Sequence, residues 1–130
     1  MTRPAPRALL AMWIAMGSTT ASGTPETLLG PYRAAGAGPF SAERGAAAWN
    51  RKTGVEERSC SGCHGTDLKA SGRHMKTGKT IGPLAPSVDP KRLSDTGEVE
   101  KWLLRNCRWT WGRECTPQEK GDFLQYIGSQ

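Results

Sequence analysis

The sequence predicts a small all-α domain. Capping residues and apolar side chains at helical spacing mark helices over about 41–52, 97–107 and 117–128, and we expect no strands. The chain has 130 residues, which suits one domain, and its hydrophobic content of 36% excludes a polytopic membrane protein. With 16 glycines and 9 prolines, much of the chain should be loop. A core of side chains alone would be thin, so a cofactor or a cross-link should help hold the domain together.

Residues 1–22 have the three parts of a secretory signal peptide. Arg3 and Arg7 supply the positive start, the nine residues Ala8–Met16 are all apolar, and small residues follow. Nine apolar residues are too few to span a bilayer, which takes roughly 20. We therefore expect cleavage near residues 21–23 and export to the periplasm, with no membrane insertion afterwards. An uncleaved membrane anchor is the alternative.

Residues 23–39 form an N-terminal extension rich in Gly, Pro and Ala. Leu28, Leu29 and Tyr32 could make a short helical turn that docks on the rest of the protein. Pro31 should limit the length of this turn, because proline lacks the backbone N–H that a helix interior needs.

The domain proper, residues 40–130, opens with the helix over about 41–52. Ser41 can cap this helix, and Phe40 can pack against it as a hydrophobic staple. Gly45 falls inside the helix, where glycine costs about 1 kcal/mol relative to alanine. A close helix crossing would explain a glycine at this position.

Residues 60–64 form a C-x-x-C-H motif. The thiols of Cys60 and Cys63 can add to the two vinyl groups of one haem, and His64 can then bind the iron. In an exported chain, this spacing is strong evidence for one covalent haem c. A thioredoxin-like redox pair is an alternative, but no βαβ pattern surrounds the motif. Zinc is another, but it needs a fourth ligand, such as His74.

Residues 66–94 show neither helical periodicity nor alternation. A structureless loop of this length is unusual inside a compact domain. A haem offers a reason for it, because the loop can wrap a large apolar disc. We expect Ile81, Leu84 and Val88 to face that disc.

Two capped helices complete the chain. Asp95 with Glu98 resembles a capping box for the helix over about 97–107. Val99, Trp102, Leu103 and Asn106 share one face of this helix, so an amide continues an apolar stripe. In the last helix Thr116 is the cap, Pro117 takes the first position and Glu119 completes a second capping box, and the helix ends at Gly128.

The remaining cysteines are Cys107 and Cys115. The other two thiols belong to the haem motif, and the periplasm is oxidising, so we expect these two to form a disulfide. A loop of this length would stabilise the fold by about 2–3 kcal/mol in the chain-entropy model. Two free buried thiols are the alternative.

The residues alone leave open which group binds the iron on the side opposite His64. After signal cleavage the chain keeps one methionine, Met75, and one further histidine, His74, both only ten or eleven residues after His64. Electron-transfer cytochromes usually use Met or His at this position. Four possibilities therefore remain: an open site, His74, Met75, or a weak donor such as Asn106.

Several stretches of the chain resemble the sphaeroides haem protein family, which comprises high-spin monohaem c-type cytochromes of purple bacteria and their relatives. These stretches are the C-x-x-C-H motif, residues 74–90, residues 99–107 ending in Arg-Asn-Cys, residues 112–116 with Gly-Arg-Glu-Cys-Thr, and residues 119–122. The resemblance covers about residues 40–127. The Arg-Asn-Cys and Gly-Arg-x-Cys elements are more specific than C-x-x-C-H alone.

The resemblance implies a class I cytochrome c-like fold, with helices and a long loop packed around one covalent haem. It implies that Asn106 is the sixth ligand of ferric iron and that the disulfide lies near the haem. It further implies that Asn106 leaves on reduction, so that ferrous iron can bind O2, NO or CO. An amide oxygen is a hard, weak donor, which suits Fe(III) better than Fe(II). Family members are associated with a dihaem cytochrome c and a membrane cytochrome b as electron donors.

The leading hypothesis is a periplasmic electron carrier that also binds a diatomic gas at ferrous iron. An enzyme that converts oxygen or nitric oxide on the same haem is the second hypothesis, and a plain low-spin electron shuttle is the third. The formal net charge is +6; removing Arg3 and Arg7 from the 18 basic residues leaves 16 against 12 acidic ones, a net +4. Because no Lys/Arg run exceeds two residues, we expect no nucleic-acid binding. An acidic partner could instead dock on Lys69, Arg73, Lys76 and Lys79.

Overall fold

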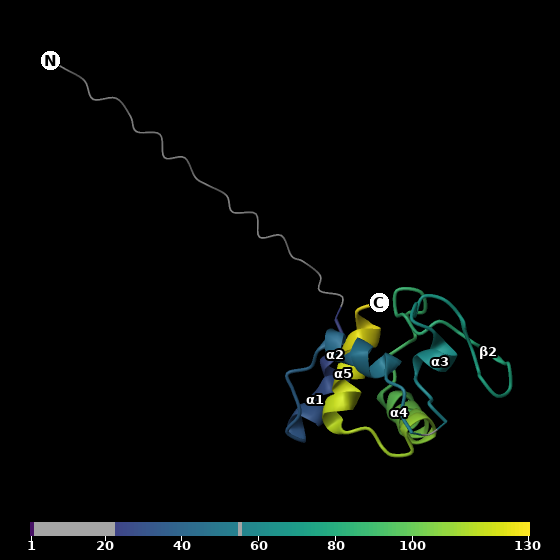
Figure 1. The fold of residues 1–130 in the computed structure, drawn as a ribbon. Helices are drawn as coiled ribbons and strands as arrows, with labels where there is room; N and C mark the ends of the chain where they lie inside the picture. Colours follow the sequence, from purple (N-terminus) through teal and green to yellow (C-terminus); the bar gives the residue numbers. More distant parts are fainter. Residues whose placement is uncertain (2–22, 55) are drawn as a thin grey trace.

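The computed structural model describes residues 1, 23–54 and 56–130, so the predicted signal peptide lies almost wholly outside the described part. None of the helices in that part is long and apolar enough to cross a membrane. The described residues form short helices and one small ladder (Figure 1): α1 (Glu26–Ala34), α2 (Ala42–Asn50), α3 (Ser61–His64), β1 (Gly72–Arg73), β2 (Thr80–Ile81), α4 (Thr96–Trp111) and α5 (Pro117–Gly128). The predicted all-α fold class is confirmed.

The N-terminal extension forms helix α1, which docks through its buried side chains Leu28, Leu29 and Tyr32. These pack with Leu124 of α5 in a small core of their own. The expected limit at Pro31 is wrong, because the helix continues three residues past it to Ala34. Proline removes one helical hydrogen bond, and burial of the apolar face of α1 compensates for this loss.

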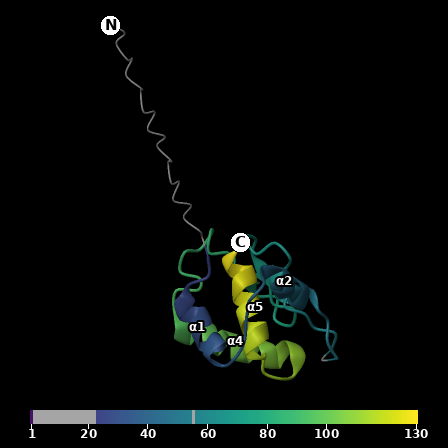
Figure 2. The ribbon, with the colours of Figure 1, turned by 90° about the vertical axis from the view of Figure 1, so that its left-hand side faces the viewer.

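Helix α5 packs against both α2 and α1, which lie on opposite sides of it (Figure 2). A Cβ atom added to Gly45 would lie 2.1 Å from the backbone oxygen of Asp122, so no larger residue fits there. The predicted close crossing at Gly45 is therefore confirmed. Arg44 closes the crossing by donating through Nε and Nη2 to the buried Asp122 carboxylate, at 2.9 Å each.

Helix α4 begins as the sequence predicts, with the Asp95 side chain accepting from the Glu98 N–H at 2.9 Å. Its predicted end at about residue 107 is wrong, because the helix continues to Trp111. Thr110 and Trp111 are buried on this additional turn. Gly112 then ends the helix with a left-handed φ of 70°, which glycine adopts without strain.

Helix α5 has the predicted capping box. The Thr116 hydroxyl accepts from the Glu119 N–H at 3.2 Å, and the Glu119 carboxylate accepts from the Thr116 N–H at 2.9 Å. Phe123, Leu124 and Ile127 are buried along its apolar face. The main core packs around this helix and holds Trp49, Leu68, Trp111 and Tyr126 as well.

The long segment over 66–94 contains little regular structure, but the expectation of no strands is wrong. Strands β1 and β2 pair antiparallel, with Gly72 opposite Ile81 and Arg73 opposite Thr80. A Cβ atom at Gly72 would lie 2.2 Å from the oxygen of Cys63, so glycine lets this ladder rest directly on α3. Such a two-residue ladder depends on this tertiary contact, which no local sequence pattern records.

Candidate functional site

The site is a large, partly open cavity of about 1240 Å³ lined by α3, α4, α5 and the segment over 66–94. It exceeds the roughly 300–1,000 Å³ that is typical of ligand pockets. Side chains on its walls are mainly apolar or aromatic: Trp49, Ile81, Leu84, Leu93, Val99, Trp102, Leu103, Trp109, Trp111, Phe123, Leu124 and Ile127. Of the predicted disc-facing residues, Ile81 and Leu84 line the cavity. Val88 does not and is 50% exposed, so that expectation is wrong.

The three residues of the C-x-x-C-H motif all border this cavity. Helix α3 brings Cys60, Cys63 and His64 to one wall, and neither cysteine takes part in a disulfide. Burial raises the pKa of the Cys60 thiol to about 12. A thioredoxin-like nucleophile needs a lowered thiol pKa, so the redox-pair alternative does not fit this site.

The imidazole of His64 lies in a mostly apolar environment. Burial lowers its pKa, and the nearby charge of Arg92 lowers the pKa further, so the ring stays neutral. Its Nδ1 atom is buried and has no hydrogen-bond partner among the described residues. The ring of Trp49 packs beside it, and the Trp49 indole donates to the carbonyl of Gly65 at 2.9 Å. A neutral imidazole held in this way suits a metal ligand.

Asn106 lines the same cavity from α4. Val99, Trp102 and Leu103 line it too, so the face predicted from their spacing is the face that borders the site. The Asn106 side chain makes no hydrogen bond to the part of the chain that the structure describes. An amide oxygen is therefore available to a ligand in the cavity.

The two competing axial residues differ in position. Met75 is 51% exposed and does not border the cavity. His74 does border it, but its Nδ1 accepts from the N–H groups of Lys76 at 3.3 Å and Thr77 at 3.2 Å. In the neutral ring, the proton must then sit on Nε2, which leaves no free lone pair for a metal.

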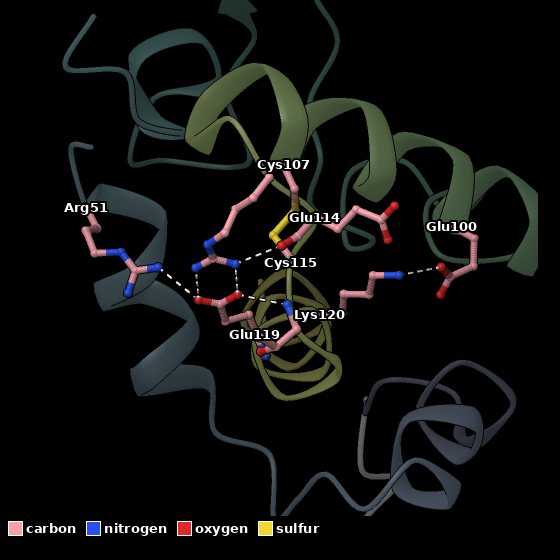
Figure 3. The surroundings of a disulfide bond; sticks show 9 residues. Arg51, Glu100, Cys107, Glu114, Cys115, Glu119 and Lys120 are labelled. Carbon is pink, nitrogen blue, oxygen red and sulfur yellow. Dashed lines mark hydrogen bonds and ion pairs between the residues drawn. A yellow bond between two sulfur atoms is a disulfide. The ribbon is translucent and has the colours of Figure 1, made fainter. Parts of the chain in front are cut away.

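The structure joins Cys107 and Cys115 by a disulfide, the pairing expected from the sequence, with the Cα atoms 5.6 Å apart. Both residues line the cavity, and Cys107 follows Asn106 directly. Glu119 holds the loop that the disulfide closes (Figure 3): Arg113 donates to both of its carboxylate oxygens at 2.8 Å, and Arg51 pairs with it at 3.1 Å. These contacts fix the end of α4 relative to α5.

Two residues of the site were not expected from the sequence. Neither Trp49 nor Arg92 was predicted to take part in the site. Arg92 donates to the carbonyl of Pro83 at 2.8 Å and pairs with Asp89 at 3.2 Å beside the His64 wall. No spacing rule connects residue 64 with residue 92, because only the path of the long loop brings them together.

The described residues fit a covalent haem c better than a lone metal ion. No group of three or more His, Cys, Asp or Glu side chains among them is placed to hold a metal, so the zinc alternative lacks a ligand set. In contrast, two thiols and a neutral imidazole border a large apolar cavity, and the buried Nδ1 of His64 has no partner. This combination matches a macrocycle with two thioether links and one axial histidine.

Comparisons with known proteins agree with this geometry. The model of a family described as "Domain of unknown function (DUF1924)" matches residues 35–127. Cytochrome c-type protein SHP of Cereibacter sphaeroides is 46% identical over 110 residues, which cover 82% of this chain and 84% of that protein.

Two solved structures are similar over most of the chain. Oxidised SHP, described as an oxygen-binding cytochrome c, aligns with a TM-score of 0.76 and 43% identity, covering 83% of this chain and 98% of the other. The solution structure of cytochrome c'' from Methylophilus methylotrophus, described with insights into haem-ligand detachment, aligns with a TM-score of 0.69 and 34% identity. It covers 81% of this chain and 92% of the other.

Proposed function

Since this chain belongs to the family of the cytochrome c-type protein SHP, we propose that it is a periplasmic electron carrier that binds a diatomic gas in its reduced state. The chain is a monohaem c-type cytochrome and carries one covalently bound haem c. Cys60 and Cys63 would form the two thioether bonds, and His64 would bind the iron. When bound, the haem supplies a one-electron iron couple and a coordination position at which a gas can bind.

The position of Asn106 carries the proposal. It lies on the cavity-facing stripe of α4, whereas Met75 lies outside the cavity and His74 has its Nδ1 engaged by backbone N–H groups. The neutral amide oxygen is a weak, hard donor that suits ferric iron and binds ferrous iron poorly. The Asn106 side chain can therefore hold the site closed in the oxidised protein and release it on reduction.

Two relatives support a gated site. The similar SHP structure is described as an oxygen-binding cytochrome c, and the similar cytochrome c'' structure is described in terms of haem-ligand detachment. If Asn106 leaves the iron on reduction, this chain would combine ligand detachment with gas binding. O2, NO and CO are the candidate ligands.

Electrons would enter at the face formed by Lys69, Arg73, Lys76 and Lys79, all of which are exposed. Exposed Met75 lies within this stretch, and its N–H donates to the Cys63 sulfur at 3.4 Å. The face thus connects directly to a cysteine that would be bonded to the haem. Its positive charge fits an acidic redox partner, for which a dihaem cytochrome c or a membrane cytochrome b is the candidate.

Optical spectra of the purified holoprotein test the gating. Ferric protein should be high-spin, ferrous protein should be five-coordinate and bind CO rapidly, and the colour should stay with the protein in acid–acetone. Asn106→Ala should change the ferric spectrum, and Asn106→His should give a low-spin protein that excludes CO, because imidazole holds both oxidation states. A wild-type ferrous protein that is low-spin and refuses CO would refute the proposal, as would a ferric spectrum that responds to His74→Ala but not to Asn106→Ala.

A further inference from the structure

The walls of the haem cavity carry more positive than negative side chains. Its cationic residues are Lys79, Lys91, Arg92, Arg105 and Arg108, and its carboxylates are Asp95 and Glu98. Both carboxylates have other roles, since Asp95 caps α4 and Glu98 pairs at 2.7 Å with Lys101, which is not on the cavity wall. Neither carboxylate forms an ion pair with any of the five cations.

Two of the five cations are neutralised from outside the cavity wall. Arg92 pairs with Asp89 at 3.2 Å, and Arg108 pairs with Glu114 at 2.7 Å. Lys79, Lys91 and Arg105 make no ion pair with any described residue. The two propionate carboxylates of a haem could pair one to one with at most two of these three cations.

Arg105 is the one closest in the chain to the proposed axial ligand. It directly precedes Asn106 on α4 and is exposed. Its guanidinium lies 5.0 Å from the ring centroid of Trp102, a residue of the cavity-facing stripe. Helical spacing places residues 102 and 105 on the same side, so this unpaired charge is held at the edge of the face that carries Asn106.

We propose that Arg105 draws small inorganic anions to the ferric iron, where they displace the weakly bound Asn106, which makes Arg105 a determinant of ligand specificity. The inference rests on the proposed role of Asn106 as the displaceable ligand. A positive group at the mouth of a cleft raises the local concentration of an anionic ligand, and electrostatic steering can raise association rates by about 10–10³-fold. A neutral gas gains nothing from the same charge. Anions and gases should therefore respond differently to changes at Arg105.

The experiment compares azide binding to ferric holoprotein with CO binding to ferrous holoprotein by stopped-flow absorbance. In Arg105→Glu, the association rate of azide should fall by about tenfold at low ionic strength, and the deficit should shrink as salt shortens the Debye length. Arg105→Gln should give a smaller fall in the same direction. The CO rate should stay within about twofold of wild type in both variants, because CO carries no charge.

Lys52→Glu is the matched control, since Lys52 is exposed, has no place in the cavity wall and undergoes the same change of two charge units. Equal effects of Lys52→Glu and Arg105→Glu on azide would overturn the inference, as would equal slowing of azide and CO. A ferric protein that does not bind azide would also overturn it. Failure of the ferrous protein to bind CO would instead contradict the proposed gas-binding function, whatever the azide rates are.

Discussion

The indole ring of Trp49 lies 5.4 Å from the imidazole of His64, measured between ring centroids, and its N–H donates to the Gly65 carbonyl at 2.9 Å. Helix α2 thereby supports the residue that would bind the iron. The orientation of such a histidine affects the properties of the metal it binds.

Trp49→Phe should keep most of the ring packing but lose the hydrogen bond to Gly65. We expect a loss of about 1–3 kcal/mol in the free energy of unfolding, because the carbonyl loses its partner. We also expect a changed haem reduction potential, measured by potentiometric titration. Tyr126→Phe is the control. The Tyr126 ring packs on Trp49, and its hydroxyl donates to the carbonyl of Thr66, next to Gly65, at 3.3 Å. The loss of this hydroxyl should leave the reduction potential unchanged. Equal shifts of the reduction potential in both variants would show that the effect comes from looser packing in general and not from the lost hydrogen bond to Gly65.

Gly45→Ala should destabilise the crossing of α2 and α5. The new methyl group would overlap backbone atoms of Asp122, which cannot move aside as a flexible side chain can. Overpacking of this kind costs about 1–3 kcal/mol or more, measurable by chemical denaturation of the holoprotein. At Gly30 on α1 the nearest atom to an added Cβ is 3.7 Å away, so Gly30→Ala should be neutral or stabilising by up to about 1 kcal/mol. Similar results for the two variants would contradict the close crossing.

The stability of the disulfide loop should depend on pH through Glu119. Its hydrogen bonds from Arg113, with those from the Thr116 N–H and Arg51, lower the pKa of this carboxyl from 4.5 to about 2. Because the folded-state pKa is the lower one, the ionised group stabilises the fold fully above about pH 4.5, and this contribution is lost as the pH falls through about 2.

Glu119→Gln lacks this contribution, so the difference in unfolding free energy between wild type and variant should be largest at neutral pH and narrow below about pH 4.5. Denaturation series at several pH values measure this difference. Glu57→Gln serves as control, because Glu57 is exposed and makes no ion pair with the described residues. A Glu119→Gln loss of stability that does not change with pH would argue against the ionised Glu119 carboxylate as the group that holds the disulfide loop.

Electron transfer from an acidic partner should weaken with salt and with charge reversal at the proposed docking face. Lys69 and Arg73 are exposed, make no ion pair with the described residues and do not line the haem cavity, so a Lys69→Glu/Arg73→Glu double variant should fold normally. Its rate of reduction by the proposed partner, a dihaem cytochrome c, should fall by about tenfold or more at low ionic strength and converge with the wild-type rate at high salt. Lys52→Glu should have a much smaller effect. Rates that do not depend on ionic strength would exclude this face.

The sequence by itself determined the features that depend on neighbours in the chain. The C-x-x-C-H spacing, the capping box of Thr116 and Glu119, and the stripe that ends in Asn106 are set within one or two helical turns, and the structure contains each of them. Gly45 was also interpretable, because a glycine inside a helix has few explanations other than a close approach.

Only the tertiary structure decided which of the remaining candidate residues line the haem cavity. Met75 and His74 are adjacent in sequence, yet one lies outside the cavity and the other lines it, and Arg92 reaches the wall of His64 across a long irregular loop. The last turn of α4 exists because Thr110 and Trp111 are buried. These outcomes depend on contacts between residues far apart in the chain, whose packing energies exceed the local preferences that a sequence pattern reports.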